Sequence, residues 1–227
     1  MNQTLCIIPA RGGSKRIPYK NIKDFLGKPI IAYSIKAALE SELFDEVIVS
    51  TNNKEISKIA IEFGAKVPFI RSEENANDFA TTIDVVNEVL NDYKSVGKIF
   101  SKVCVLYPTS PLVSVLNLQK GYKKLNHYDA VIPVAEYSSP IQRAFIISDK
   151  VLKYKWPEFE KSRSQDLDRF YYDAGQWYWI NVQSIKDTLV PLKTSYIVLD
   201  KIECHDIDTL SDWEMAELKY RKIRKIN

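Results

Sequence analysis

Residues 46–64 read EVIVSTNNKEISKIAIEFG and contain the pattern that decides the fold. The apolar run at 46–51 predicts a buried strand, and the amphipathic run at 53–64 predicts a helix that ends at Gly64. The same alternation continues on both sides, with strands expected at 5–8, 67–70, 102–107 and 129–135 and helices at 29–42, 81–97 and 114–125. It predicts an α/β fold, a three-layer sandwich with helices on both faces of a mainly parallel, Rossmann-like sheet.

The alternation stops near residue 136. Residues 136–181 contain short aromatic-rich, strand-like pieces and two prolines, and no convincing helix. We therefore expect a single domain over residues 1–227 in which 136–181 form an inserted antiparallel excursion. The excursion carries four large aromatic residues, more than one small hairpin buries: Trp156, Trp177, Tyr178 and Trp179. Packing on the parent domain and contact with a second copy in a homodimer both stay open.

The chain returns to a regular pattern after the excursion. Residues 194–199 predict a strand, and residues 209–223 predict a helix that begins with a capping-box pattern at Thr209 and Asp212. Trp213 and Ala216 lie on one face of this helix, which is therefore expected to pack against the body.

Composition and charge restrict the function. The 227 residues are 45% hydrophobic and 27% charged, as in a protein with a substantial core, and the net charge of +3 is too weak to indicate a nucleic-acid partner. No apolar run approaches the ~18 residues of a membrane span, and no signal-peptide pattern is present, so we expect a cytoplasmic protein. Cys6, Cys104 and Cys204 lie far apart in apolar contexts and are expected to be buried thiols.

A glycine-containing basic loop follows the first predicted strand. Residues 7–21, IIPARGGSKRIPYKN, contain neither of the two common phosphate-binding fingerprints. Gly12 and Gly13 nevertheless let backbone N–H groups approach an anion, Ser14 adds a hydroxyl, and Arg11 and Lys15 add positive charge. A basic surface turn is the alternative. The carboxyl end of a parallel strand is where such sheets bind ligands, which favours an anion site.

A pair of carboxylates occurs near the other end of the chain. In the segment CHDIDT, Asp206 and Asp208 are separated by one residue, so in an extended backbone both side chains point to the same face. Oxygen ligands of this kind suit Mg²⁺, which takes one or two carboxylates together with substrate phosphates. Helix capping by Asp208 next to Thr209 is the alternative.

Taken together, these motifs resemble those of the cytidylyltransferases that activate sialic-type (nonulosonic) acids, the CMP-sugar synthetases. The matching stretches are IPARGGSKRIPYKN, LGKPIIAYSIKAAL, FDEVIVSTNN, PFIRSEENANDFATT, YPTSPL and HDIDTLSDWEMAE, in this order from residue 7 to about 217. The resemblance implies a fold of the nucleotide-diphospho-sugar transferase type. RSQDL at 163–167 and DAGQWYW at 173–179 look like the branch that uses pseudaminic acid.

The resemblance implies a Mg²⁺-dependent transfer of CMP from CTP to the anomeric hydroxyl of a nine-carbon 2-keto sugar acid, with release of pyrophosphate. Arg11, Lys15, Lys20 and Asp206 would be catalytic. The nucleotide would be held by Arg11, Gly12, Gly13, Ser14, Lys15, Lys20, Asn21, Arg71, Ala80 and Thr82, of which Ala80 and Thr82 border the base. Read from the residues alone, Arg71 is a solvated loop charge and Ala80 and Thr82 belong to a helix cap. Asp206 and Asp208 would hold the metal.

The acid sugar needs a cation and hydrogen-bonding groups of its own. The expected sugar-binding residues are Tyr107, Gln142, Arg143, Arg163, Gln165 and Gln176. Tyr107 stands where the branch that uses N-acetylneuraminate has Gln. Tyr172 and Trp177 pack either on the acyl groups or at a dimer contact, and the sequence leaves both open.

No histidine is an evident general base, because His127 is expected in a surface turn and His205 points away from Asp206. Metal-assisted deprotonation of the sugar hydroxyl is therefore expected. Alternatives are a synthetase for N-acetylneuraminate, legionaminate or the eight-carbon acid of lipopolysaccharide, and a non-catalytic nucleotide-binding scaffold.

Overall fold

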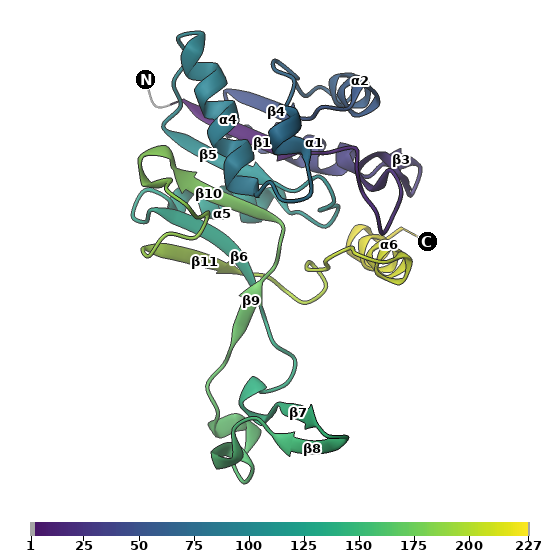
Figure 1. Cartoon of the computed structure of the whole chain (residues 1–227), viewed down its shortest axis with the longest axis vertical. Helices are drawn as coiled ribbons and strands as arrows, with labels where there is room; N and C mark the ends of the chain where they lie inside the picture. The colour runs from purple at the N-terminus through teal and green to yellow at the C-terminus, as the bar shows by residue number, and fades with distance from the viewer. Residues whose placement is uncertain (1–2, 227) are drawn as a thin grey trace.

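A mainly parallel sheet forms the centre of the protein (Figure 1). The computed structural model describes residues 3–226. In this part of the chain the strands of the central sheet follow in the order β11-β6-β10-β5-β1-β4, and β9 pairs with the end of β6. The bounds are β1 Thr4–Pro9, β4 Glu46–Ser50, β5 Lys102–Leu106, β6 Ala130–Glu136, β9 Tyr171–Asp173, β10 Trp177–Asn181 and β11 Thr194–Val198. Strand β1 is parallel to β4 and β5, and β11 is parallel to β6.

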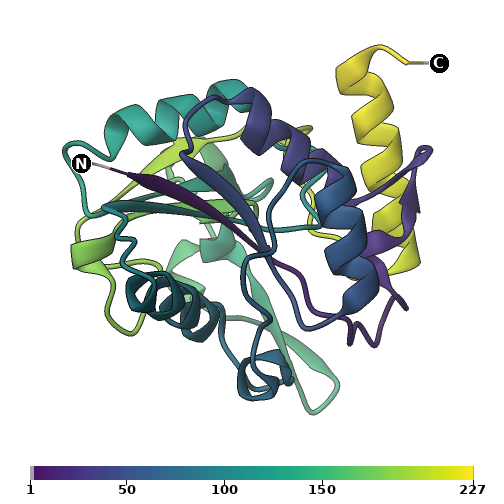
Figure 2. The same cartoon turned by 90° about the horizontal axis from the view of Figure 1, so that it is seen from above.

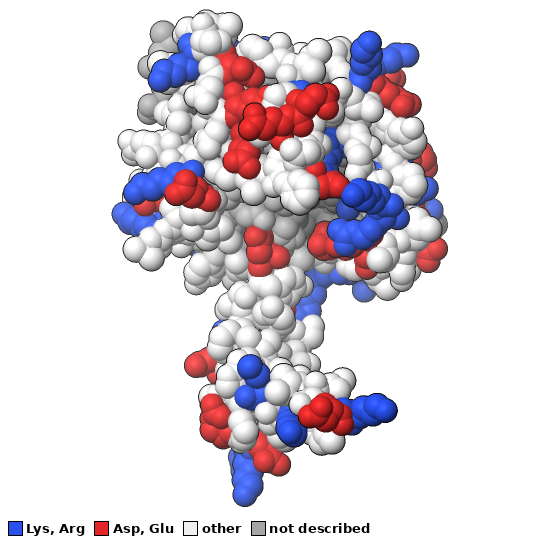
Figure 3. Space-filling view, viewed as in Figure 1, with Lys and Arg blue, Asp and Glu red and all other residues white. Residues whose placement is uncertain are grey.

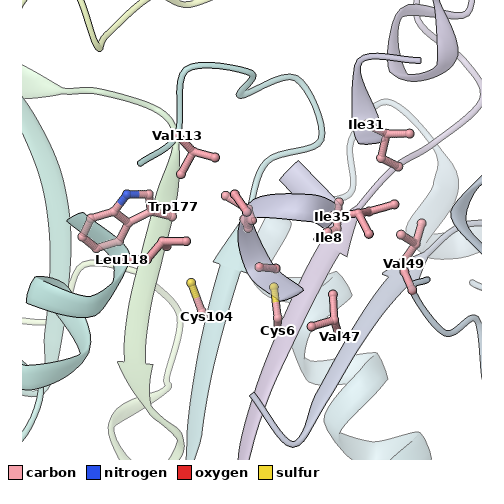
Figure 4. Packing of buried hydrophobic residues seen from close by; sticks show 14 of the residues in the cluster. Cys6, Ile8, Ile31, Ile35, Val47, Val49, Cys104, Val113, Leu118 and Trp177 are labelled. Carbon is pink, nitrogen blue, oxygen red and sulfur yellow. The ribbon is translucent and has the colours of Figure 1, made fainter. Parts of the chain in front are cut away.

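Helices cover both faces of the sheet (Figure 2), as expected. One face packs against α1 Ile31–Glu40, α2 Lys54–Glu62 and α5 Val115–Lys124, and the other packs against α4 Thr82–Ser95. Successive side chains of β1 point to opposite faces of the sheet and pack against the helices on each face. Cys6 and Ile8 belong to the cluster with Ile31 and Ile35 of α1 (Figure 4), whereas Leu5 and its neighbour on the same face pack with α4.

A third cluster attaches the C-terminal helix α6, Leu210–Arg224, to the segment after the basic loop. That segment contains the short helices and strands η1 Lys20–Ile22, β2 Asp24–Phe25 and β3 Lys28–Pro29. Ile17, Phe25, Ile207 and Trp213 are buried together in this cluster. Thr209 caps α6 and forms the expected capping box with Asp212. The two ends of the chain are therefore joined by apolar packing.

The excursion is an arm that extends from the body (Figure 1). Its outer part contains η2 Ile141–Arg143, β7 Phe145–Ser148, β8 Val151–Tyr154, η3 Pro157–Phe159 and η4 Ser164–Asp166, and β7 and β8 form an antiparallel hairpin. The expected extent of the antiparallel excursion, 136–181, is too long. Strand β10 lies between β5 and β6 in the central sheet, antiparallel to both, and Trp177 and Trp179 are fully buried.

Contact between α5 and β10 explains this placement. Gly121 of α5 leaves room for the two indole rings, because a Cβ there would lie 2.7 Å from Trp177 and 2.8 Å from Trp179. The indole N–H of Trp179 donates to the Leu118 carbonyl at 3.1 Å. Trp177 faces Leu118 and Cys104 in Figure 4. The expectation that Trp177 contacts an acyl group or a partner is therefore wrong.

One expected strand is also wrong, since residues 67–70 form no strand. Lys66 and Ile70 make only isolated bridges, to Ile48 and Thr51. Pro68 has no N–H to donate to a ladder, which interrupts pairing at this edge of the sheet. The three cysteines are buried free thiols, as expected. No helix in residues 3–226 is long and apolar enough to cross a membrane.

Candidate active site

A cavity of about 600 Å³ opens at the carboxyl ends of the parallel strands, where the sequence places the basic loop. It lies among the loop after β1, the segment between β4 and α4, and the end of β5. The lining residues are Pro9, Arg11, Ser14, Lys15, Arg16, Lys20, Asn21, Arg71, Asn75, Asn77, Asp78, Ala80, Thr81, Thr82, Val85 and Tyr107. Basic side chains gather on the surface between β3 and α6, with acidic side chains beside them (Figure 3).

The phosphate loop, which we define as residues 10–16 and name for its expected role, is held in place by one backbone and one side-chain hydrogen bond. The Ala10 N–H donates to the Ser50 carbonyl at 2.9 Å, and Asn21 Nδ2 donates to the Arg11 carbonyl at 2.9 Å. Gly12 passes close to Asn53, since a Cβ at Gly12 would lie 2.8 Å from Asn53 Nδ2. At Gly12 a larger residue would therefore displace either the loop or the Asn53 side chain, whereas Gly13 has open space around it.

Arg71 is the buried cation of the cavity. Only 6% of this residue is exposed, its Nε donates to Ser50 Oγ at 3.0 Å, and its Nη2 donates to the Ser50 carbonyl. Burial lowers the pKa of Arg71 to about 10, partly offset by the charge of Glu88, and nearby Arg11 lowers it further. The guanidinium stays charged at neutral pH. A cation fixed in this way is a strong attraction for an anionic ligand.

Asp208 brings the C-terminal segment to the phosphate loop. Its Oδ1 lies 2.7 Å from Nη2 of Arg16 and 3.5 Å from Nζ of Lys20. Lys20 also donates to the carbonyl of Ile207. Asp206, two residues earlier, is exposed. The two motifs thus meet, and the helix cap is supplied by Thr209 rather than by the Asp208 side chain.

The start of α4 forms the other wall. Thr81 caps α4 in a capping box with Asp84, while Ala80 and Thr82 line the cavity. Thr82 Oγ1 lies 3.3 Å from the hydroxyl of Tyr107. Thr81 is therefore the capping residue of α4. Ala80 and Thr82, which the resemblance places beside the nucleotide base, line the cavity.

Comparison with known families matches residues 5–155 to the family described as Cytidylyltransferase. The chain belongs to this family. A pseudaminic acid cytidylyltransferase of Campylobacter jejuni is 42% identical over 228 residues, which cover 96% of this chain and 97% of that protein. A CMP-N,N'-diacetyllegionaminic acid synthase of Legionella pneumophila is 45% identical over 107 residues, covering 47% of this chain and 46% of that protein.

A solved structure of a CMP:2-keto-3-deoxy-manno-octonic acid synthetase complexed with CTP has the same fold, with a TM-score of 0.70 and 17% identity. It covers 98% of this chain and 100% of that one. The expected fold class and the expected CTP-dependent nucleotidyl transfer are confirmed.

The expected metal ligands of this cytidylyltransferase consist of oxygen donors only. In residues 3–226 no three acidic, histidine or cysteine side chains cluster closely enough to hold a metal ion by themselves. Asp208 contacts Arg16 and Lys20, which line the cavity, and one or two carboxylates fit Mg²⁺, which takes the rest of its ligand shell from substrate and water. Asp208, now paired with Arg16, and the exposed Asp206 would be those ligands.

The expected sugar-binding residues are not brought together within one chain. Tyr107 lines the cavity. Gln176 is buried beside it, and its backbone carbonyl accepts the Tyr107 N–H at 2.9 Å while its side-chain amide donates to the Glu203 carbonyl. The remaining four lie in the arm, away from the body (Figure 1): Gln142, Arg143, Arg163 and Gln165.

Gln142 is engaged within the arm. It is 6% exposed, and its Nε2 donates to the Asp168 carbonyl at 3.0 Å. This bond connects the two ends of the arm, which is a structural use of its amide. The remaining side-chain oxygen has no hydrogen-bond partner among the described residues, but it is buried and is not exposed to a sugar in this arrangement.

Sequence reasoning missed one group at the cavity, Asp78, and one group behind its Tyr107 wall, Tyr178. Asp78 pairs with both Arg11 and Lys15, at 2.8 and 2.5 Å. Tyr178, whose ring lies 5.5 Å from that of Tyr107, donates to Asp173 at 2.6 Å. Burial, with the charges of Tyr107 and Asp173, raises the pKa of Tyr178, so it stays protonated as a donor. The signal for Asp78 was its place in a turn before a helix, where a carboxylate reads as a capping residue.

Proposed function

We propose that this cytidylyltransferase transfers CMP from CTP to the anomeric hydroxyl of pseudaminic acid, releasing pyrophosphate. The observation that supports the acid is the 42% identity, over almost the whole of both chains, to a relative named for pseudaminic acid. The convergence of five cations on one cavity at the strand ends supports the triphosphate. The arm residues that would select the acid lie outside the cavity of their own chain.

The nucleotide would lie with its phosphates on the phosphate loop and its base against α4. Backbone N–H groups at Gly12 and Gly13, the Ser14 hydroxyl and the charges of Arg11, Lys15 and Arg71 would hold the triphosphate. Lys20 and Asn21 would continue this site, and Ala80 and Thr82 would border the base. Placing these cations in advance lowers the cost of the charge that develops on the departing pyrophosphate.

Asp206 and Asp208 would hold Mg²⁺, which when bound supplies further stabilisation of phosphate charge. Among the described lining residues there is no histidine. Burial, reinforced by Lys219, lowers the pKa of His205, whose Nε2 lies 3.8 Å from Oδ1 of Asp212. We therefore expect no imidazole to act on the sugar hydroxyl.

We also propose a homodimer formed through the arm. The hairpin exposes apolar side chains on both strands, with Ile147 79% and Leu152 58% exposed. Such a surface favours a protein contact. The arm also carries Arg143 and Arg163, which are remote from the cavity of their own chain. A partner's cavity is where they would meet the sugar carboxylate.

A substrate panel tests the function. Pyrophosphate release from CTP would be measured with pseudaminic acid, N-acetylneuraminic acid, legionaminic acid and the eight-carbon acid, each with and without EDTA. Turnover is expected with pseudaminic acid and Mg²⁺ and should stop with EDTA. Preference for legionaminic acid, which the 45% identical segment of the Legionella relative makes the second candidate, would replace the proposed acid. Lack of turnover with every acid would favour a scaffold. A cytoplasmic location fits the use of CTP and is part of this proposal.

A further inference from the structure

The triphosphate cavity contains its own anion. Among the described residues that line it, Asp78 is the sole carboxylate beside five cations. Its Oδ1 lies 2.8 Å from Nη1 of Arg11, and its Oδ2 lies 2.5 Å from Nζ of Lys15. Each carboxylate oxygen thus takes one cation of the phosphate loop.

A phosphate group needs the same two donors. Carboxylate and phosphate oxygens both accept short, charge-assisted hydrogen bonds from Arg and Lys. Lys15, and to a smaller extent Arg11, hold the pKa of Asp78 below its usual range, so the carboxylate is ionised at neutral pH. Two anions at one pair of cations repel each other, and a bound phosphate and Asp78 therefore compete.

The turn that carries Asp78 is held by polar contacts. Asn77 Oδ1 accepts the N–H groups of Phe79 and Ala80 at 2.7 and 2.9 Å, and the Asn77 carbonyl accepts from Arg11 at 2.9 Å. Phe79, next to Asp78, is 92% exposed, so the turn has no apolar anchor at its tip. Displacing the tip therefore costs little apolar burial. It also leaves α4 capped, because the capping residue is Thr81.

We infer that Asp78 is an internal counter-ion of the phosphate loop, which a triphosphate displaces from Arg11 and Lys15 and which returns to them as pyrophosphate leaves. The inference rests on the proposed function for the identity of the nucleotide, whereas the competition itself concerns only phosphate groups. Asp78 sets the affinity of the site: it weakens nucleotide binding and speeds pyrophosphate release. Both ion pairs are partly exposed, so the effect is about three- to tenfold.

Calorimetric titration of inorganic pyrophosphate, and separately of CTP, into wild type and Asp78→Asn tests this inference. The Kd of the variant should be about three- to tenfold lower at low salt for both ligands, and the difference should shrink as ionic strength rises. Asp78→Ala should change Kd in the same direction, and pyrophosphate dissociation followed by stopped flow should slow. Glu62→Gln is the matched control, because it removes the same charge from an exposed position at the end of α2, outside the lining.

An unchanged or higher Kd in Asp78→Asn would overturn the inference and would make Asp78 a residue that holds Arg11 and Lys15 in position. Failure of wild type to bind pyrophosphate would also overturn it. The proposed function fails differently. Binding of pyrophosphate and CTP without turnover of any acid would rule out the reaction. The ratio of the Kd of Asp78→Asn to the Kd of wild type would still decide the role of Asp78.

Discussion

The guanidinium of Arg16 lies 2.7 Å from the carboxylate of Asp208. This ion pair joins the loop after the first strand to the segment before the last helix. Beneath it, Ile17 and Ile207 are both buried in one apolar cluster with Trp213 of α6. Apolar packing therefore fixes the position of the basic loop relative to the segment that carries Asp208, although the two lie far apart in the chain.

Lys15→Ala should reduce kcat/KM for CTP about a hundredfold, or ~3 kcal/mol of transition-state stabilisation, because one well-placed cation is lost where phosphate charge develops. The side chain is 82% exposed, so the melting temperature should not change. Initial rates of pyrophosphate release measure the effect. Lys58→Ala removes an exposed charge from α2 and serves as the control. Equal rates for both variants would exclude Lys15 from the site.

Asp208→Asn should raise the Mg²⁺ concentration for half-maximal rate and lower kcat, because one of the two proposed carboxylate ligands is lost. Asp206→Asn should act in the same direction, and EDTA should abolish the activity of wild type. The measurement is a Mg²⁺ titration of the initial rate at saturating CTP. Glu214→Gln, an exposed position on α6, should leave the titration unchanged. Identical Mg²⁺ curves for Asp208→Asn and wild type would contradict the assignment of the metal ligands.

Local patterns predicted most of the fold, because each strand and helix of the parallel half carries its own periodicity. Strand β10 could not be placed in this way. Its sequence, WYWIN, suits any strand, and its position between β5 and β6 depends on the room that Gly121 leaves for two indole rings. The prediction of a strand at residues 67–70 is wrong for the opposite reason. Here the local apolar pattern favours a strand, but Pro68 cannot take part in regular pairing.

The candidate site shows the same division. Arg11, Lys15 and their neighbours could be predicted because they are consecutive and follow a strand. Asp78 could not, because its role depends on a turn that returns to the loop from a distant part of the chain. Residue type alone predicts that Arg143 and Arg163 of the arm bind the acid sugar. Their distance from the cavity is a property of the three-dimensional arrangement, which residue type does not encode.

Gly121→Ala should destabilise the protein by about 1–3 kcal/mol, although alanine is the better helix former. The new methyl group would lie 2.7–2.8 Å from Trp177 and Trp179, both fully buried, so α5 would have to move from the sheet. Urea unfolding measures the change. Lys120→Ala on the same helix is exposed and should alter the unfolding free energy by less than about 0.5 kcal/mol. A stabilised Gly121→Ala variant would refute the close contact.

Glu46 should stabilise the fold at neutral pH and lose this effect in acid. Burial raises the pKa of Glu46, but hydrogen bonds from Lys98, Tyr93 and Lys66 outweigh burial and leave it below the ordinary value of 4.5. Because the folded state lowers this pKa, ionised Glu46 contributes its full stability above the ordinary value of 4.5. The contribution declines as pH falls through the pKa of the folded state. Glu46→Gln should therefore cost about 1–3 kcal/mol at pH 7.

Urea unfolding of Glu46→Gln and wild type at pH 7 and at several values below 4.5 measures this dependence. The difference in unfolding free energy should shrink as the solution becomes more acidic. Glu62→Gln is the control, because it removes a carboxylate from an exposed position and should alter the unfolding free energy by less than about 0.5 kcal/mol. A gap for Glu46→Gln that is constant with pH would mean that the ion pairs with Lys98 and Lys66 are not the source of its stability.

Ile147→Lys combined with Leu152→Lys should convert the proposed dimer into a monomer, because both side chains are exposed on paired strands of the arm hairpin and a charge there would be costly to bury. Light scattering coupled to size exclusion measures the mass. The body should keep its melting temperature, since the hairpin lies apart from the central sheet (Figure 1). If the arm completes a partner's cavity, the monomer should show a higher KM for the sugar acid with an unchanged Kd for CTP. A dimeric double variant with wild-type kinetics would place the interface elsewhere.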